Sequence, residues 1–68
     1  MEKTLHVDGH ELHFATTCDG DSQYHVEVHH LNKLLSAFAV SAASESEVFP
    51  KAIAHVEADL DIGNITLS

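Results

Sequence analysis

The chain is short of cysteine and of basic residues, and each shortage excludes a class of protein. Cys18 is the single cysteine, so no intramolecular disulfide can stabilise the chain. Three basic residues stand against eleven acidic ones, which gives a formal net charge of −8. Binding to nucleic acid requires lysine and arginine to neutralise phosphates, so this composition argues against it.

The chain also lacks long apolar runs and catalytic motifs. Its beginning, MEKTLHVDG, predicts neither a secretory signal nor a membrane anchor, and we expect a cytoplasmic protein. Cys18 can be paired with a histidine as nucleophile and base, but no oxyanion loop or third orienting residue accompanies such a pair. We therefore expect no enzyme and no cofactor. A chain of 68 residues predicts one small domain, residues 1–68.

Residues 4–14 predict a β-hairpin around the turn Asp8-Gly9, because both central positions of such a turn favour φ above zero. With the turn there, Thr4 pairs with His13. This register separates an apolar face from a polar face, which supports it over a register shifted by one residue. The apolar face carries Leu5, Val7 and Leu12, and the polar face carries Thr4, His6, Glu11 and His13.

Polar and apolar residues alternate again from Tyr24 to Val28, which predicts a third strand, although an irregular lead into a helix is the alternative. The clearest periodicity follows, from Leu31 to Ala43. Apolar residues recur there at helical spacing, which predicts the main helix of the protein. These residues are Leu31, Leu34, Leu35, Phe38, Ala39 and Ala42.

A second, shorter helix is predicted to begin at Ser46 as N-cap, or at Pro50, and to run to about Asp59. The apolar residues from Leu60 to Leu67 then predict a last strand. The expected fold is α+β, with two helices packed on one face of a small antiparallel sheet. Its element order is ββ(β)ααβ.

Histidines supply candidate metal ligands, with His6, His13 and His25 expected on one face of the sheet. Three imidazoles are a ligand set that Zn²⁺ or Ni²⁺ accepts. Their spacing matches no structural zinc motif, and polar histidines on the wet face of a strand are the alternative. We therefore expect no metal site.

Two segments are candidates for contact with another protein. Ser36, Ala37 and Val40 lie opposite the apolar face of the predicted main helix, in a strip that carries almost no charge. Such a strip requires a cover, which is the second helix, a protein partner or a second copy in a homodimer. The second segment is acidic and is either a solvated edge or a contact for a basic protein surface. It comprises Glu57, Asp59 and Asp61.

The hairpin residues Lys3, Thr4, Leu5, Val7, Gly9, Leu12 and Phe14 carry a resemblance to one known family. With the alanine-rich segment from Lys51 to Ala58 and the apolar residues after it, the chain resembles small phage tail assembly chaperones. The resemblance implies a non-enzymatic protein, encoded by a phage or prophage. It also implies that this protein binds a tail component, such as the tape measure protein, in the host cytoplasm before assembly.

We therefore expect a small acidic protein that acts through protein–protein interaction, with tail assembly chaperoning as the specific hypothesis. One alternative is an acidic inhibitor of a nuclease or defence complex, of the anti-restriction, anti-CRISPR or immunity type. Another alternative is a histidine-rich metal-binding module, and binding to a membrane is not expected.

The composition predicts a solubility minimum at about pH 5 to 6, between the ordinary pKa values of carboxylates and histidines. Protonation of all seven histidines would bring the formal charge from −8 to −1, which removes the repulsion between molecules. Light scattering during an acid titration measures this. A signal that stays flat across that range would contradict the prediction.

Overall fold

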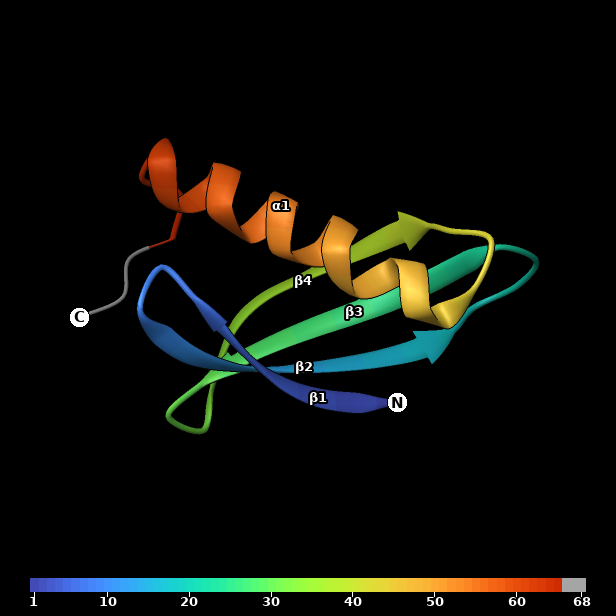
Figure 1. Cartoon of the computed structure of the whole chain (residues 1–68), viewed down its shortest axis with the longest axis horizontal. Helices are drawn as coiled ribbons and strands as arrows, with labels where there is room; N and C mark the ends of the chain where they lie inside the picture. Colours follow the sequence, from blue (N-terminus) through green and yellow to red (C-terminus); the bar gives the residue numbers. More distant parts are fainter. Residues whose placement is uncertain (66–68) are drawn as a thin grey trace.

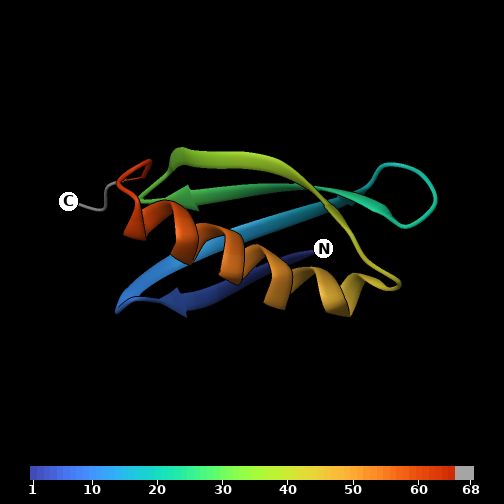
Figure 2. The ribbon, with the colours of Figure 1, turned by 90° about the horizontal axis from the view of Figure 1, so that it is seen from above.

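The computed structural model describes residues 1–65 and shows an antiparallel sheet with one α-helix lying across one of its faces (Figures 1 and 2). The four strands lie side by side in chain order, β1-β2-β3-β4. The elements are β1 (Glu2–Val7), β2 (His10–Cys18), β3 (Gln23–His30), β4 (Lys33–Ser41), the 3-10 turn η1 (Glu45–Glu47) and α1 (Val48–Asp61). The α+β prediction of two helices in the order ββ(β)ααβ is therefore wrong, because the order is ββββα.

The predicted N-terminal hairpin is confirmed in its turn and in its register. Asp8 and Gly9 have φ values of 55° and 82°, as a two-residue turn between twisted strands requires. Thr4 lies opposite His13, and Val7 lies opposite His10. The turn chemistry and the alternation of side chains point to the same pairing, which is why this part of the fold was predictable.

The third strand is also confirmed, and it is longer than the predicted segment from Tyr24 to Val28. β3 runs antiparallel to β2, with Phe14 opposite Val28 and Thr16 opposite Val26. The alternation therefore directs the valines of β3 to the same side as Phe14.

The segment from Leu31 to Ala43 is not a helix, since Lys33–Ser41 forms strand β4. Leu31 and Asn32 have φ values of 52° and 65° and make a tight turn that returns the chain beside β3. Leu35 is the extra residue of a β-bulge, because Val28 lies opposite Ser36 while His29 lies opposite Leu34. The bulge places half-buried apolar residues three apart, at Leu35 and Phe38, and this spacing imitates a helix.

The predicted second helix exists as α1 and buries the expected face, with Ala52 and Val56 fully covered. Its predicted cap is wrong, since Ser46 lies within η1. Pro50 is the third residue of α1, where a backbone N–H would have no partner inside the helix. The predicted strand from Leu60 to Leu67 is wrong in its described part, because Leu60 belongs to α1 and turns follow. Leu67 lies outside the described residues.

The core lies between α1 and the face of the sheet that α1 covers. Side chains from all four strands and from the helix meet there, and the largest fully buried ones are Phe14, Leu12, Val7, Val26, Val28, Val48 and Val56. Thr16 is the buried polar residue of this face; its hydroxyl donates to the Glu45 carboxylate at 3.1 Å. The Met1 ammonium donates to the Thr16 carbonyl at 2.9 Å, so the chain start is joined to the same group.

Replacing Leu31 by Asn and Asn32 by Gly should raise the free energy of unfolding by about 1–2 kcal/mol, because leucine is strained at positive φ. Leu31 is 78% exposed, so the substitution removes little packing. Urea denaturation measures the change. A loss of stability, which glycine would cause inside a helix, would contradict the strand assignment.

Candidate functional site

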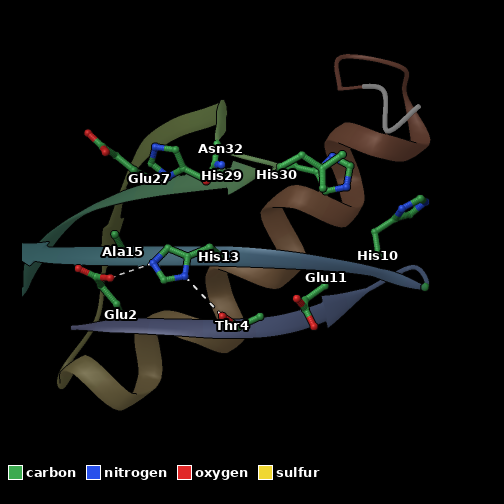
Figure 3. A pocket seen from close by; sticks show the side chains of 12 residues that line it. Glu2, Thr4, His10, Glu11, His13, Ala15, Glu27, His29, His30 and Asn32 are labelled. Atoms are coloured by element: carbon green, nitrogen blue, oxygen red, sulfur yellow. Dashed lines mark hydrogen bonds and ion pairs between the residues drawn. The ribbon is translucent and has the colours of Figure 1, made fainter.

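The face of the sheet opposite α1 carries no described helix and forms what we call the open face (Figure 3). Alternation along the paired strands assigns its residues. They are Glu2, Thr4, His6, Glu11, His13, Ala15, Thr17, Gln23, His25, Glu27, His29, Leu34, Ala37, Ala39 and Ser41. A shallow depression on this face is lined by Glu2, His13, Glu27 and His29, among others. The open face thus gathers histidines and glutamates and no lysine.

Three histidines of the open face each lie beside a glutamate. The Nε2 atoms of His13, His6 and His25 lie 2.9, 3.8 and 3.5 Å from carboxylate oxygens of Glu2, Glu11 and Glu27, respectively. These side chains are exposed to a large extent, so each pair contributes little to stability.

His13 has the best-defined surroundings of these histidines (Figure 3). Its Nε2 lies 2.9 Å from the Glu2 carboxylate, and its Nδ1 lies 3.4 Å from the Thr4 hydroxyl. A carboxylate only accepts, so Nε2–H donates to Glu2, and in the neutral ring the Thr4 hydroxyl donates to Nδ1. The ring is therefore oriented from both sides, but no nucleophile contacts it.

The three candidate metal ligands do not form a site. His6 and His13 share the open face as expected, but His25 lies opposite Thr17, farther along the sheet. The cross-strand neighbour of His13 is His29, which sequence reasoning missed because it did not assign the register between the second and third strands. Within residues 1–65, no group of three or more histidine, cysteine or acidic side chains is placed to hold a metal ion.

The candidate strip of Ser36, Ala37 and Val40 is not one surface, because these residues lie on a strand. Val40 is 8% exposed and belongs to the core, while Ala37 is exposed on the open face. Ser36 lies opposite Val28 and is half-buried on the side of α1. The lack of charge that marked this segment is therefore a property of both faces of β4 after Lys33.

The outer edge of β4 has no partner strand among residues 1–65, and Figure 2 shows β4 outermost on the side away from β1. The Ala42 amide donates to the Ser22 carbonyl at 3.0 Å. Along an antiparallel strand, the backbone N–H and C=O groups of successive residues point alternately to the two neighbouring sides. Those of Phe38 and Val40 therefore point to the same side as the Ala42 amide and bond to β3, whereas those of Ala37 and Ala39 point outward. The edge therefore offers a row of amide and carbonyl groups to another strand.

At both ends of this row the backbone groups are not available for regular pairing with another strand. At one end Leu35 makes the bulge that interrupts the ladder. At the other end the Lys51 ammonium donates to the Ser41 carbonyl at 2.6 Å and occupies that outward acceptor. What remains is a regular segment, residues 36–40, centred on Phe38. We call it the β4 edge.

The two edges of the sheet differ in charge. From Leu34 to Ser44 the chain has no charged residue and no histidine, whereas β1 carries Glu2, Lys3 and His6. Proteins usually protect an edge strand from pairing with other chains by placing charged side chains or proline on it. β1 has this protection along its length, whereas β4 has it only at its ends, from Lys33, the bulge at Leu35 and the Lys51 contact with Ser41.

The acidic candidates lie near the end of α1 and do not all have the same surroundings. Glu57 and Asp61 line a small depression together with Asp8 from the β1–β2 turn. Asp59 instead faces His55, with Oδ2 and Nε2 3.2 Å apart. The structure therefore adds Asp8 to the acidic group and removes Asp59 from it. Sequence reasoning missed Asp8, which joins this group only through the contact between turn and helix.

Cys18 lies exposed at the end of β2, and its thiol donates to the Gly20 carbonyl at 3.3 Å. No helix in the described part of the chain is both long enough and apolar enough to span a membrane.

Comparison with protein-family models, with curated proteins and with solved structures found no match. The resemblance to tail assembly chaperones and the cytoplasmic location therefore stay predictions.

Replacing Val40 by Glu should cost at least about 3 kcal/mol, because it leaves an uncompensated charge in the core. The matched variant Ala39→Glu should keep the fold, since Ala39 is exposed. Circular dichroism and urea denaturation compare the two. Equal stability of both variants would show that the assignment of faces on β4 is wrong.

Proposed function

We propose that this chain is a small non-enzymatic protein that acts by binding an extended segment of another polypeptide along the β4 edge. The observation that carries the proposal is an edge strand whose outward amide and carbonyl groups between Ser36 and Val40 are accompanied by no charged residue of that segment. Added strands bind through such groups, and neighbouring side chains provide the specificity.

The side chains around the β4 edge favour this mode of binding. Ala37 and Ala39 are small and exposed on the open face, so they leave room for the side chains of an added strand. On the other face Phe38 is half-buried and stacks on His55, with ring centroids 4.0 Å apart. The side chains of an added strand would therefore contact small alanines on the open face and the aromatic Phe38 on the face that α1 covers.

The identity of the partner rests on the resemblance to tail assembly chaperones. It implies a tail component, such as the tape measure protein, as the partner, and a phage or prophage as the source. The physical case for the β4 edge does not depend on this resemblance.

A second candidate function uses the acidic group of Asp8, Glu57 and Asp61. Carboxylates from a turn and a helix end converge there on a chain whose formal charge is −8. This arrangement favours a basic protein surface, as on a nuclease that an acidic inhibitor blocks.

A peptide of the β4 sequence, Lys33–Ser41 with an added lysine at each end, should bind the dilute protein. The amide signals of Ala37 and Ala39 should shift most in an NMR titration of labelled protein, because these amides gain hydrogen bonds. Ala39→Pro should weaken binding by about tenfold or more, since proline cannot donate.

His6→Pro is the matched control. β1 is the opposite edge strand, and the backbone groups of Lys3 and Val7 bond to β2. The amide of His6 therefore points away from β2, so proline at this position removes no hydrogen bond between the two strands. Unchanged binding by Ala39→Pro, or shifts located on β1, would overturn the proposed function.

The second candidate is tested by charge removal. Asp8→Asn together with Glu57→Gln should weaken binding to a basic protein such as a nuclease, and the affinity of the unmodified protein should fall steeply with added salt. Affinity that does not change with salt would exclude this candidate.

A further inference from the structure

We infer that the occupant of the β4 edge is a second copy of this chain, paired antiparallel about a two-fold axis that passes beside Phe38. The inference rests on the proposed function, because it requires the same edge to accept a strand. It assigns the β4 edge to a second copy of the chain, in place of the tail component that the resemblance alone implies.

The register follows from the closed ends of the β4 edge. The bulge at Leu35 and the Lys51 contact with the Ser41 carbonyl leave residues 36–40 available. Two copies of this five-residue segment pair along their whole length, antiparallel, only when Phe38 of one copy lies opposite Phe38 of the other. Ala37 then lies opposite the partner's Ala39, and their outward amides and carbonyls exchange hydrogen bonds.

This register is self-complementary in its side chains as well. The two Phe38 rings become neighbours at the axis on the helix-covered face, where a non-hydrogen-bonded pair brings side chains closest. On the open face alanine meets alanine. No charged group is paired with a like charge, because the segment contains none.

The charge of the whole chain favours a second copy over an unrelated partner. Two chains that each carry −8 repel one another over most of their surfaces, and contact is least unfavourable where acidic residues are absent. A basic partner would instead be attracted to the acidic surfaces, and an uncharged edge would give it no advantage. An uncharged edge therefore favours binding mainly of a partner that is itself negatively charged.

Sedimentation equilibrium of the purified full chain should show a monomer–dimer equilibrium between about 10 µM and 1 mM, since a small interface gives a weak dimer. Added salt, from about 0.05 to 0.5 M, should strengthen dimerisation, because it screens repulsion between like charges. Weakening by salt would overturn the inference, since it would indicate attraction between opposite charges.

Two variants separate the β4 edge from the open face as the surface of contact. Ala39→Lys adds a charge at the edge and should weaken dimerisation by about tenfold or more. Thr17→Lys adds the same charge on the open face at a central strand and should leave dimerisation unchanged. Loss of the dimer in Thr17→Lys, with retention in Ala39→Lys, would place the contact on the open face and overturn the inference.

The register is tested by cross-linking in a Cys18→Ser background. Phe38→Cys should form an intermolecular disulfide readily, because residues on the axis face their own copies at a distance that a disulfide spans. Leu34→Cys is the control, since it lies away from the axis and should form far less. Equal cross-linking of both variants would overturn the register.

The two proposals fail in different ways. In one outcome the peptide binds the β4 edge while the protein stays monomeric at about 1 mM, a concentration that would reveal even a weak dimer. That result would exclude the second copy and leave the proposed binding of an added strand in place. If neither peptide binding nor dimerisation occurs, both are wrong.

Discussion

The structure depends on one constraint, which is that a single helix can cover one face of a four-stranded sheet and no more. Nearly every large apolar side chain of the strands points toward α1, with Leu34 as an exposed exception, and register is set by this requirement. Phe14, Val26 and Val28 satisfy it and are fully buried. The opposite face carries mainly histidine, glutamate, threonine and alanine. The same constraint leaves the outer strand β4 without cover on its edge, since no further element of residues 1–65 lies beyond it.

Local sequence chemistry predicted those parts of the fold in which turn and alternation agree. The Asp8-Gly9 turn defined the first hairpin to the residue, and the alternation from Tyr24 to Val28 defined the third strand. β4 was missed for physical reasons. Alanine and serine are compatible with either face of a strand or of a helix, and the bulge at Leu35 breaks the alternation. Only tertiary pairing with β3 decides between the two structures.

Among the candidate sites too, features set by local sequence were predictable, whereas features set by pairing between strands were not. The shared face of His6 and His13 was predictable from the hairpin, whereas the neighbourhood of His13 and His29 required the register between β2 and β3. The absence of charge after Lys33 was visible in the sequence and was interpreted as a strip on a helix that requires a cover. Its physical meaning changed with the secondary structure: an uncharged strip on a helix implies side-chain packing, while an uncharged edge strand exposes its backbone to pairing.

The most direct test of this account is residue-resolved amide hydrogen exchange along β4, at a concentration low enough to keep the protein monomeric. The account predicts alternation, with Phe38 and Val40 exchanging slowly because they bond to β3, and Ala37 and Ala39 exchanging fast because they point outward. Uniform protection of all four amides, as in a helix or in a strand already covered on both sides, would contradict it.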